Sequence, residues 1–425
     1  DGGRAATDII GAMPCATIRP YNPDCDRLPC IRIMEEIGWG LGDEKETGAL
    51  FDSYISECDV LVAELNGEAE SFAVCRSGNL RYLEKDVPVG FITGVGTSRI
   101  ARGRGLALAT TASVLERAAC SGAAVGRLGV FDQGFYDRLG FGSLGYVRSS
   151  TIDPCRLQVP KLARVPRRLT ADDAEDMHAC RLRRMRWHGA CNLDGVGTTR
   201  CEMAWEKSKF GLGFNSDDGR LSHCMFVKPK GEHGPYNVDW MAYETPEQFI
   251  ELLSVLKSLG DQVHGIAIAD PPHVQLQDML ETPFLTLRSR DGGTFDMKPR
   301  SNAWEQIRIL DLDACIAAVQ LPGETVRFNL QLHDPITEWL PADATWKGLA
   351  GSYVVTLGPK SSIESGSEDT LQTLAASVGA FTRLWIGARP AASLAISDQF
   401  ECEPGLCIDL DRVMRLPTPI SDWDA

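Results

Sequence analysis

The stretch Arg102-Gly103-Arg104-Gly105-Leu106-Ala107 determines how the rest of this chain is interpreted, because it joins a strand-like run to a helix-like run. Glycines at such a junction leave backbone N–H groups bare where a helix begins, and the helix dipole makes that end positive. Two arginines add further positive charge. The stretch therefore predicts a turn that binds a diphosphate. A plainer interpretation is that its two glycines only allow a surface loop to turn.

The flanking residues indicate what this turn connects. Residues 89–97 follow the two-residue period of a β-strand, and three glycines leave one face of that strand nearly bare. Residues 106–121 are rich in alanine and leucine at helical spacing, and Gly122 suits the position just after a helix. Residues 125–131 then read as a second strand. The sequence thus predicts a strand, a glycine turn, a helix and a strand in succession.

Common nucleotide fingerprints do not fit the turn. The chain has no G-x-x-x-x-G-K-[ST] loop, and no G-x-G-x-x-G loop with an acidic residue about 20 positions later. The pattern Arg-x-x-Gly-x-Ala at 102–107 instead resembles the acetyl-CoA signature of the GNAT superfamily of acetyltransferases. Residues 132–142, DQGFYDRLGFG, look like the Y-x-x-x-G-F segment that closes the domain in that superfamily.

Composition limits the classes to which the chain can belong. Its 425 residues, 46.4 kDa and 44% hydrophobic side chains suffice for two or three domains. No run of about 20 apolar residues could span a bilayer. The net charge of −15 argues against nucleic acid and favours cationic partners, although it also serves solubility alone. We expect a soluble globular protein with no membrane or nucleic-acid partner.

The fourteen cysteines would allow disulfides or a metal site. However, no C-x-x-C pair occurs, and the seven histidines show no metal-binding spacing. In a chain of this length without a recognisable signal peptide, the cysteines are expected to be reduced. We therefore expect a cytoplasmic protein with no bound metal.

The chain divides into three predicted units, at residues 1–155, 156–302 and 303–425. The second unit repeats the order of the first but has no glycine turn before its second helix, so it looks like a copy that has lost cofactor binding. Its predicted helices lie at 170–186 and 246–259, and its strands at 224–228, 236–243 and 263–269.

The third unit reads as α+β. Its predicted strands lie at 325–332 and 352–357, its helices at 368–376 and 391–395, and a polar turn at 361–367. The expected fold class is therefore α/β (α+β), with two tandem GNAT-like domains followed by an α+β domain.

This order of units resembles the Eis (enhanced intracellular survival) family of N-acetyltransferases. The resemblance extends to residues 382–389, TRLWIGAR, and to the terminal Trp423-Asp424-Ala425. It implies that the third unit has a fold like that of sterol carrier proteins, and that the protein is a homohexamer. One departure is that the family commonly ends on an aromatic residue, whereas this chain ends on Ala425.

The resemblance also implies which residues bind acetyl-CoA, the expected co-substrate. Edge-strand groups would contact the pantetheine arm, the turn would bind the diphosphate, and two residues after the second strand would line the thiol end. These residues are, in that order, Val95, Gly96 and Thr97; Arg102, Gly103, Arg104, Gly105, Leu106, Ala107 and Leu108; and Phe131 and Asp132.

Two catalytic roles follow from the same resemblance. Tyr136 matches the proton donor to the departing thiolate, and the carboxylate of Ala425 matches the base. A phenol suits the first role because its unperturbed pKa of about 10 lies above that of a thiol, about 8.5. The plainer role for Tyr136 is aromatic packing beside Phe135 and Phe141. An α-carboxylate has an unperturbed pKa of about 3.5, so it could act as a base only if buried or through a water.

The acceptor implied by the resemblance is an aminoglycoside or a similar polyamine, and no covalent intermediate is required. Glu35, Glu36, Asp43 and Glu44, with Trp39 as an aromatic wall, could form an acidic site, or be ordinary helix ends. Two alternatives remain open. The enzyme could acylate a protein lysine or another small amine, or the chain could be a lipid-binding protein with a vestigial transferase domain.

Overall fold

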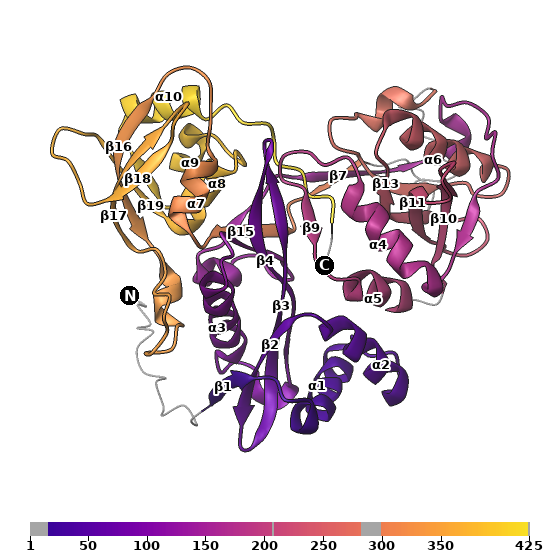
Figure 1. Ribbon diagram of the computed structural model, residues 1–425, viewed down its shortest axis with the longest axis horizontal. Coiled ribbons are helices and arrows are strands. Elements are labelled where there is room, and N and C mark those ends of the chain that lie inside the picture. The colour runs from indigo at the N-terminus through magenta and orange to yellow at the C-terminus, as the bar shows by residue number, and fades with distance from the viewer. Residues whose placement is uncertain (1–15, 206–207, 282–298, 424–425) are drawn as a thin grey trace, which may run out of the picture.

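The computed structural model describes residues 16–205, 208–281 and 299–423, which form three β-sheets with helices packed on them. In Figure 1 the first sheet lies in the centre, the second at the right and the third at the left. The mixed α/β class with two similar sheets and a further α+β unit is confirmed.

The first sheet is built on a long antiparallel hairpin of β3 and β4, and β4 pairs in parallel with β5. The strand order is β1-β2-β3-β4-β5-β15-β6, with β9 beside β3. The strands are β1 (Thr17–Pro20), β2 (Asp59–Leu65), β3 (Glu68–Tyr82), β4 (Lys85–Thr97), β5 (Val125–Gly129), β6 (Gly142–Ser143), β9 (Cys191–Leu193) and β15 (Glu305–Ile309).

Helices cover both faces of this sheet. Helix α3 (Leu106–Cys120) packs against the face that carries Leu61 and Ala73. Helices α1 (Pro23–Ile37) and α2 (Glu44–Ile55) pack against neighbouring strand residues such as Val62 and Phe72. Because successive strand residues point to opposite faces, the two helical layers lie on opposite sides of the sheet.

The second sheet repeats the arrangement, since helix α6 connects the parallel strands β12 and β13 as α3 connects β4 and β5. Its order is β14-β7-β13-β12-β11-β10-β8. The elements are β7 (Val147–Ile152), β8 (Arg167–Leu169), α4 (Ala174–Arg183), α5 (Gly197–Trp205), β10 (Phe210–Asn215), β11 (Leu221–Lys228), β12 (Tyr236–Ala242), α6 (Pro246–Ser258), β13 (Ile266–Ala269) and β14 (Pro299–Asn302).

The helix predicted at 170–186 is shorter than expected. Residues Ala171–Asp173 form a 3-10 turn that leads into α4, and Thr170 caps the turn through a capping box with Asp173. Helix α4 ends at Arg183, and Arg184 adopts an extended backbone and donates several buried hydrogen bonds instead. Tertiary hydrogen bonds thus end this helix before its apparent sequence limit.

The third unit has the sheet order β18-β17-β16-β19-β20. Its elements are α7 (Leu312–Ala318), β16 (Val326–His333), β17 (Gly351–Leu357), β18 (Ser362–Ser365), β19 (Thr373–Ser377), α8 (Val378–Trp385), α9 (Ala391–Ser397), β20 (Phe400–Cys402) and α10 (Pro404–Val413). Two predictions here were wrong. The segment 368–376, expected to be helical, contains the start of β19, and the turn expected at 361–367 contains β18.

The error at β19 has a physical cause. Its residues TLAAS favour a helix locally, but they pair in parallel with β16 over five residues and alternate in burial. Hydrogen bonds and side-chain burial along a central strand outweigh a weak helix propensity.

Strands cross the expected limits between units. Strand β7 precedes residue 155 but lies in the second sheet, whereas β15 follows residue 303 but lies in the first. The first and third units also share a core. Tyr82 of β3 stacks on Trp385 of α8 with ring centroids 4.6 Å apart, and its hydroxyl donates to the Trp385 carbonyl at 3.0 Å. None of the helices in the described ranges combines the length and apolarity that a membrane span requires.

Candidate active site

Strands β4 and β5 pair over only part of the length of β4. Their parallel pairing runs from Val89 opposite Val125 to Ile92 opposite Leu128 and then ends. At that point β4 contains a bulge, because Gly94 and Ile92 pair with consecutive residues of β3 and leave Thr93 without a partner there. Beyond the bulge, residues 94–97 pair with β3 on one side only. The predicted residues Val95, Gly96 and Thr97 therefore lie on a strand segment with a free edge toward β5.

The glycine turn follows directly. Gly103 and Gly105 have φ values of +75° and +76°, which favour glycine, and Gly105 is the N-cap of α3. No side chain caps this helix, and residues 102–104 are exposed. Side-chain oxygens of Asn22 and Asp43 do cap α1 and α2. The first amides of α3 are thus left for another acceptor, which is the arrangement predicted for a phosphate-binding turn.

In the second unit, the start of helix α6 corresponds to the start of α3, and its backbone amides are already capped. Helix α6 begins with a capping box, in which the Thr245 side chain accepts from the backbone of Gln248 and the Gln248 side chain accepts from the backbone of Thr245. Pro246 supplies no N–H group at the first helical position. Because these groups satisfy the end of α6 internally, the second unit offers no comparable anion site.

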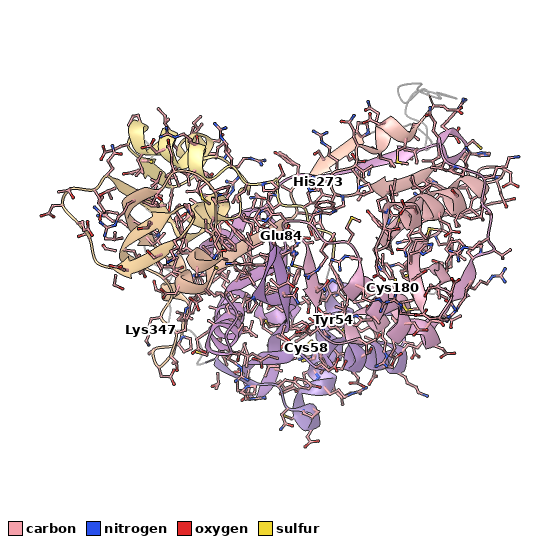
Figure 2. The ribbon with its side chains drawn as sticks, turned by 45° about the horizontal axis from the view of Figure 1, so that its top comes forward. Tyr54, Cys58, Glu84, Cys180, His273 and Lys347 are labelled. Atoms are coloured by element: carbon pink, nitrogen blue, oxygen red, sulfur yellow. The ribbon has the colours of Figure 1, made fainter. Side chains whose placement is uncertain are left out.

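The third unit contributes a residue beside the turn that sequence patterns did not suggest. A Cβ placed on Gly105 would lie 3.0 Å from Cζ3 of Trp339. The guanidinium of Arg138 sits over the Trp339 ring, 4.7 Å from its centre. Trp339 belongs to a segment that extends from the third unit along α3, and Lys347, labelled in Figure 2, lies on it too. Backbone donation from Thr345 to Glu116 of α3 at 3.0 Å fixes this segment.

Tyr136 lies close to the same corner, in a 3-10 turn over Tyr136–Leu139. Its side chain is 4% exposed, and the ring meets those of Phe135 and Phe141 edge-on at 4.9 and 6.2 Å. Burial raises the pKa of its phenol above the ordinary value, so the hydroxyl keeps its proton at neutral pH. Phe131 is 70% exposed and Asp132 is also exposed. Tyr136 therefore packs against aromatic rings and also lies near the glycine turn, so its position is compatible with both of the roles considered for it.

The end of the chain returns to the first two units. Trp423 is 1% exposed, and the guanidinium of Arg181 lies over its ring at 3.9 Å. The carboxylate of Asp422 accepts two hydrogen bonds from Arg184, at 2.7 and 2.8 Å. Ala425 lies outside the described residues. The residues before it are nevertheless held in place: Trp423 by burial under Arg181, and Asp422 by its ion pair with Arg184.

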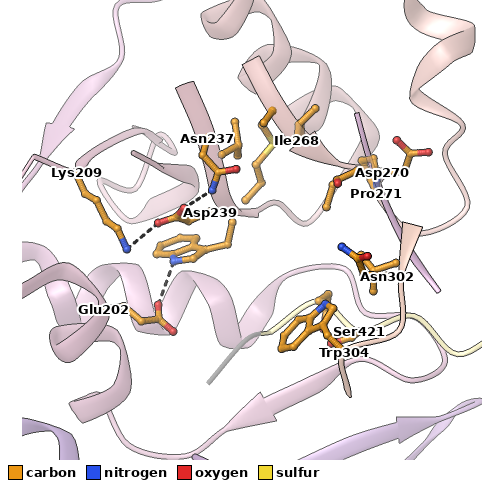
Figure 3. A pocket seen from close by; sticks show the side chains of 18 of the residues that line it. Glu202, Lys209, Asn237, Asp239, Ile268, Asp270, Pro271, Asn302, Trp304 and Ser421 are labelled. Atoms are coloured by element: carbon orange, nitrogen blue, oxygen red, sulfur yellow. Dashed lines mark hydrogen bonds and ion pairs between the residues drawn. The ribbon is translucent and has the colours of Figure 1, made fainter. Parts of the chain in front are cut away.

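A cavity of about 1070 Å³ lies between the first two sheets, and Figure 3 shows part of its lining. Trp39, Tyr54 and Thr93 line it from the first unit, whereas β12, β13 and α5 line it from the second. Tyr54, labelled in Figure 2, stands over β4, since a Cβ on Gly94 would lie 2.3 Å from its hydroxyl. The tail residues Ser421 and Asp422 close one wall. The cavity thus reaches the bulge where β4 and β5 separate.

None of the residues predicted to bind acetyl-CoA, nor Tyr136, lines this cavity. Of the residues considered for the acceptor, only Trp39 does. The four acids lie at helix ends or in local bonds: Glu35 accepts from Thr47, Glu36 accepts from the Arg99 amide at 2.6 Å, and Asp43 caps α2. Glu44 is the first residue of α2, so all four acids lie at helix ends, and an acidic acceptor site there stays a prediction. In the described ranges, no cluster of His, Cys, Asp and Glu could hold a metal ion.

Comparisons with known proteins agree with this geometry. Residues 36–144 match a family model described as an acetyltransferase (GNAT) domain. No curated protein sequence matches the chain.

Solved structures share the whole fold at low identity. A conserved protein from Enterococcus faecalis V583, described as "Probable N-Acyltransferase", has a TM-score of 0.76 at 15% identity, covering 96% of this chain and 99% of its own. A GCN5-related N-acetyltransferase from Anabaena variabilis ATCC 29413 has a TM-score of 0.74 at 11% identity, covering 96% and 99%. Eis1 from Mycobacterium abscessus has a TM-score of 0.73 at 16% identity, covering 96% and 100%. Residues 36–144 are therefore a GNAT acetyltransferase domain, and the protein that carries it is an acyltransferase.

Proposed function

We propose that this enzyme transfers the acetyl group of acetyl-CoA to a primary amine bound in the cavity between the first two sheets. The observation that carries the proposal is the uncapped start of α3 beside the separation of β4 and β5. The uncapped helix start suits a diphosphate, and the free strand edge on the other side of the same corner suits an extended arm. A CoA thioester has a diphosphate and an amide-bearing arm that suit these two surfaces.

The residues assigned to the cofactor keep their expected roles in this proposal. Arg102 to Leu108 bind the diphosphate, and the backbone of Val95, Gly96 and Thr97 bonds to the pantetheine amides. We assign Phe131 and Asp132 to the thiol end. The exposed ring of Phe131 then gains cover from the bound arm.

The chemistry is direct attack. A neutral amine forms a bond to the thioester carbonyl carbon, the C–S bond breaks, and Tyr136 gives its proton to the departing sulfur. The raised pKa of Tyr136 makes the phenol a weaker acid, but a thiolate formed in the same buried surroundings is a stronger base for the same reason. We assign the removal of the amine proton to the Ala425 carboxylate, supported by the anchoring of Trp423 and Asp422 beside the cavity.

We propose the acceptor class of the Eis family as the first candidate for this enzyme, on the strength of the shared fold. Aminoglycosides and related polyamines are then the first acceptors to test, and a cavity of about 1070 Å³ can hold one. The first alternative is acetylation of a protein lysine or of another small amine. The second alternative is lipid binding by the third unit, with a vestigial transferase domain. The three-unit division, a cytoplasmic location and a homohexamer complete the proposal.

Two measurements test the function. Isothermal titration with acetyl-CoA should give a saturable signal, and a steady-state assay that follows free CoA should show turnover with an amine. The absence of binding would reject the transferase site and leave the lipid-binding alternative. Binding without turnover on any amine, including protein lysines, would reject N-acetylation.

A further inference from the structure

Of the four carboxylates that line the central cavity in the described residues, three are paired with neighbouring cations. Asp239 pairs with the ammonium of Lys209 at 2.9 Å and also accepts from Asn237 at 2.6 Å (Figure 3). Glu202 pairs with Arg181 and accepts from the indole N–H of Trp240 at 3.1 Å. These carboxylates therefore have their strongest partners within the protein, and an incoming ammonium would have to displace them.

The fourth carboxylate, that of Asp270, has no ion pair within the described residues. Asp422 is held by Arg184, and Asp270, at the end of the cavity opposite Lys209 in Figure 3, has a pKa raised by burial. Within the described residues, Lys230 and Arg300 line the cavity and have no ionic partner. Among the described residues of the lining, four acidic side chains thus balance four basic ones in formal charge.

Aromatic side chains form much of the remaining wall. The rings of Trp39 and Trp205 meet edge-on at 6.3 Å, and Tyr54 adds a third ring on the side of β4. Trp304 lies at the end of β5, where a Cβ on Gly129 would meet its ring at 3.2 Å, and its carbonyl accepts from the Val130 amide at 2.7 Å. An aromatic wall therefore reaches the place where β4 and β5 separate.

Two buried polar atoms of residues that line the cavity lack hydrogen-bond partners in the part of the chain that the structure describes. The hydroxyl of Thr198, a residue 3% exposed, and the Oδ1 atom of Asp270 are both buried without a hydrogen-bond partner in the described residues. Buried polar atoms without partners are uncommon and point to a ligand or water that completes them.

We propose that the acceptor is a primary amine with a single positive charge on an aromatic body, and that polycations are disfavoured. This inference rests on the proposed N-acetyltransferase function, and within that function it favours the alternative acceptor, another small amine, over an aminoglycoside or polyamine. A polyamine would bring several ammonium groups to carboxylates that are already paired, next to the free cations Lys230 and Arg300. An arylalkylamine brings one ammonium, and its ring packs against Trp304 or Trp39.

The test compares acceptors and shifts the charge of the cavity. Wild-type enzyme is assayed with saturating acetyl-CoA on tryptamine and phenylethylamine, and on spermine and an aminoglycoside. We expect kcat/KM for the arylalkylamines to exceed that for the polycations by about tenfold or more. Lys209→Met keeps the apolar stem but frees Asp239, so the ratio should move toward spermine by about tenfold. Lys161→Met removes an exposed lysine of the same unit outside the cavity and should leave the ratio unchanged.

The outcomes separate this inference from the function on which it rests. A wild-type preference for spermine or the aminoglycoside overturns the acceptor class and leaves N-acetylation standing. An unchanged ratio in a folded Lys209→Met variant, checked by its thermal melt, overturns the charge argument. If wild-type enzyme binds no acetyl-CoA, the proposed function itself fails.

Discussion

Two alanine substitutions in the glycine turn offer a matched test of how the turn works. Gly103 and Gly105 have nearly the same positive φ, so an alanine at either position meets the same backbone penalty of about 1 kcal/mol. Their surroundings differ, because a Cβ on Gly103 meets nothing within 4 Å whereas a Cβ on Gly105 lies 3.0 Å from Trp339. To relieve this contact, the Trp339 side chain would have to leave its preferred rotamer, which adds about 1 kcal/mol to the penalty at Gly105.

These penalties translate into affinity for CoA. If the turn must adopt its present conformation to bind the diphosphate, the cost of reaching that conformation is subtracted from the binding free energy. Gly103→Ala should raise the Kd for CoA about fivefold, and Gly105→Ala roughly thirtyfold. Adding Trp339→Phe to Gly105→Ala removes the obstructing ring atoms and should bring the Kd back to the level of Gly103→Ala.

Isothermal titration of each variant with CoA measures these values, and thermal melts check that the variants fold. Equal losses at the two positions would show that Trp339 does not restrict the turn. Unchanged affinity in both variants would refute the assignment of the turn to the diphosphate.

The remaining predictions concern the catalytic groups and the end of the chain. Tyr136→Phe should lower kcat by about a hundredfold with little change in the Kd for CoA; equal kcat values would leave only the packing role. Residues appended after Ala425 should lower kcat without lowering the melting temperature, and an unaffected rate would remove the terminal carboxylate from the mechanism. Trp423→Ala should cost about 3 kcal/mol of stability by urea unfolding and lower activity as well, because a buried ring is lost; a native-like midpoint would contradict its anchoring role. Burial and neighbouring arginines lower the pKa of His178 from 6.5 to about 4, so the unfolded chain takes up the proton first and stability is lost as pH falls from 6.5 toward 4. His178→Asn should flatten that part of the melting curve against pH, and an unchanged slope would count against it.

The sequence predicts what local chemistry determines. The strand, glycine turn and helix around residue 105 were readable because glycine has a specific use at positive φ and because α3 repeats apolar residues at helical spacing. The sequence also showed that the second unit has no glycine turn before its second helix, whereas the capping box that closes this helix start became apparent only in the structure.

Features that combine residues far apart in the sequence could not be predicted from local patterns. The central cavity combines Tyr54, Trp240, Trp304 and Asp422, which come together only when two sheets and the tail are in place. Trp339 reaches the glycine turn from the third unit, more than 200 residues later in the sequence. No spacing rule connects such residues, so the sequence did not indicate this cavity.

The path of the tail has a consequence for the central cavity. Ser421 and Asp422 form part of its wall, and the amide of Ile420 donates to the His188 carbonyl at 3.0 Å. Every strand of the first two sheets lies before these residues in the sequence. A chain cut before Ser421 would therefore keep both sheets and still lack one side of the cavity that lies between them.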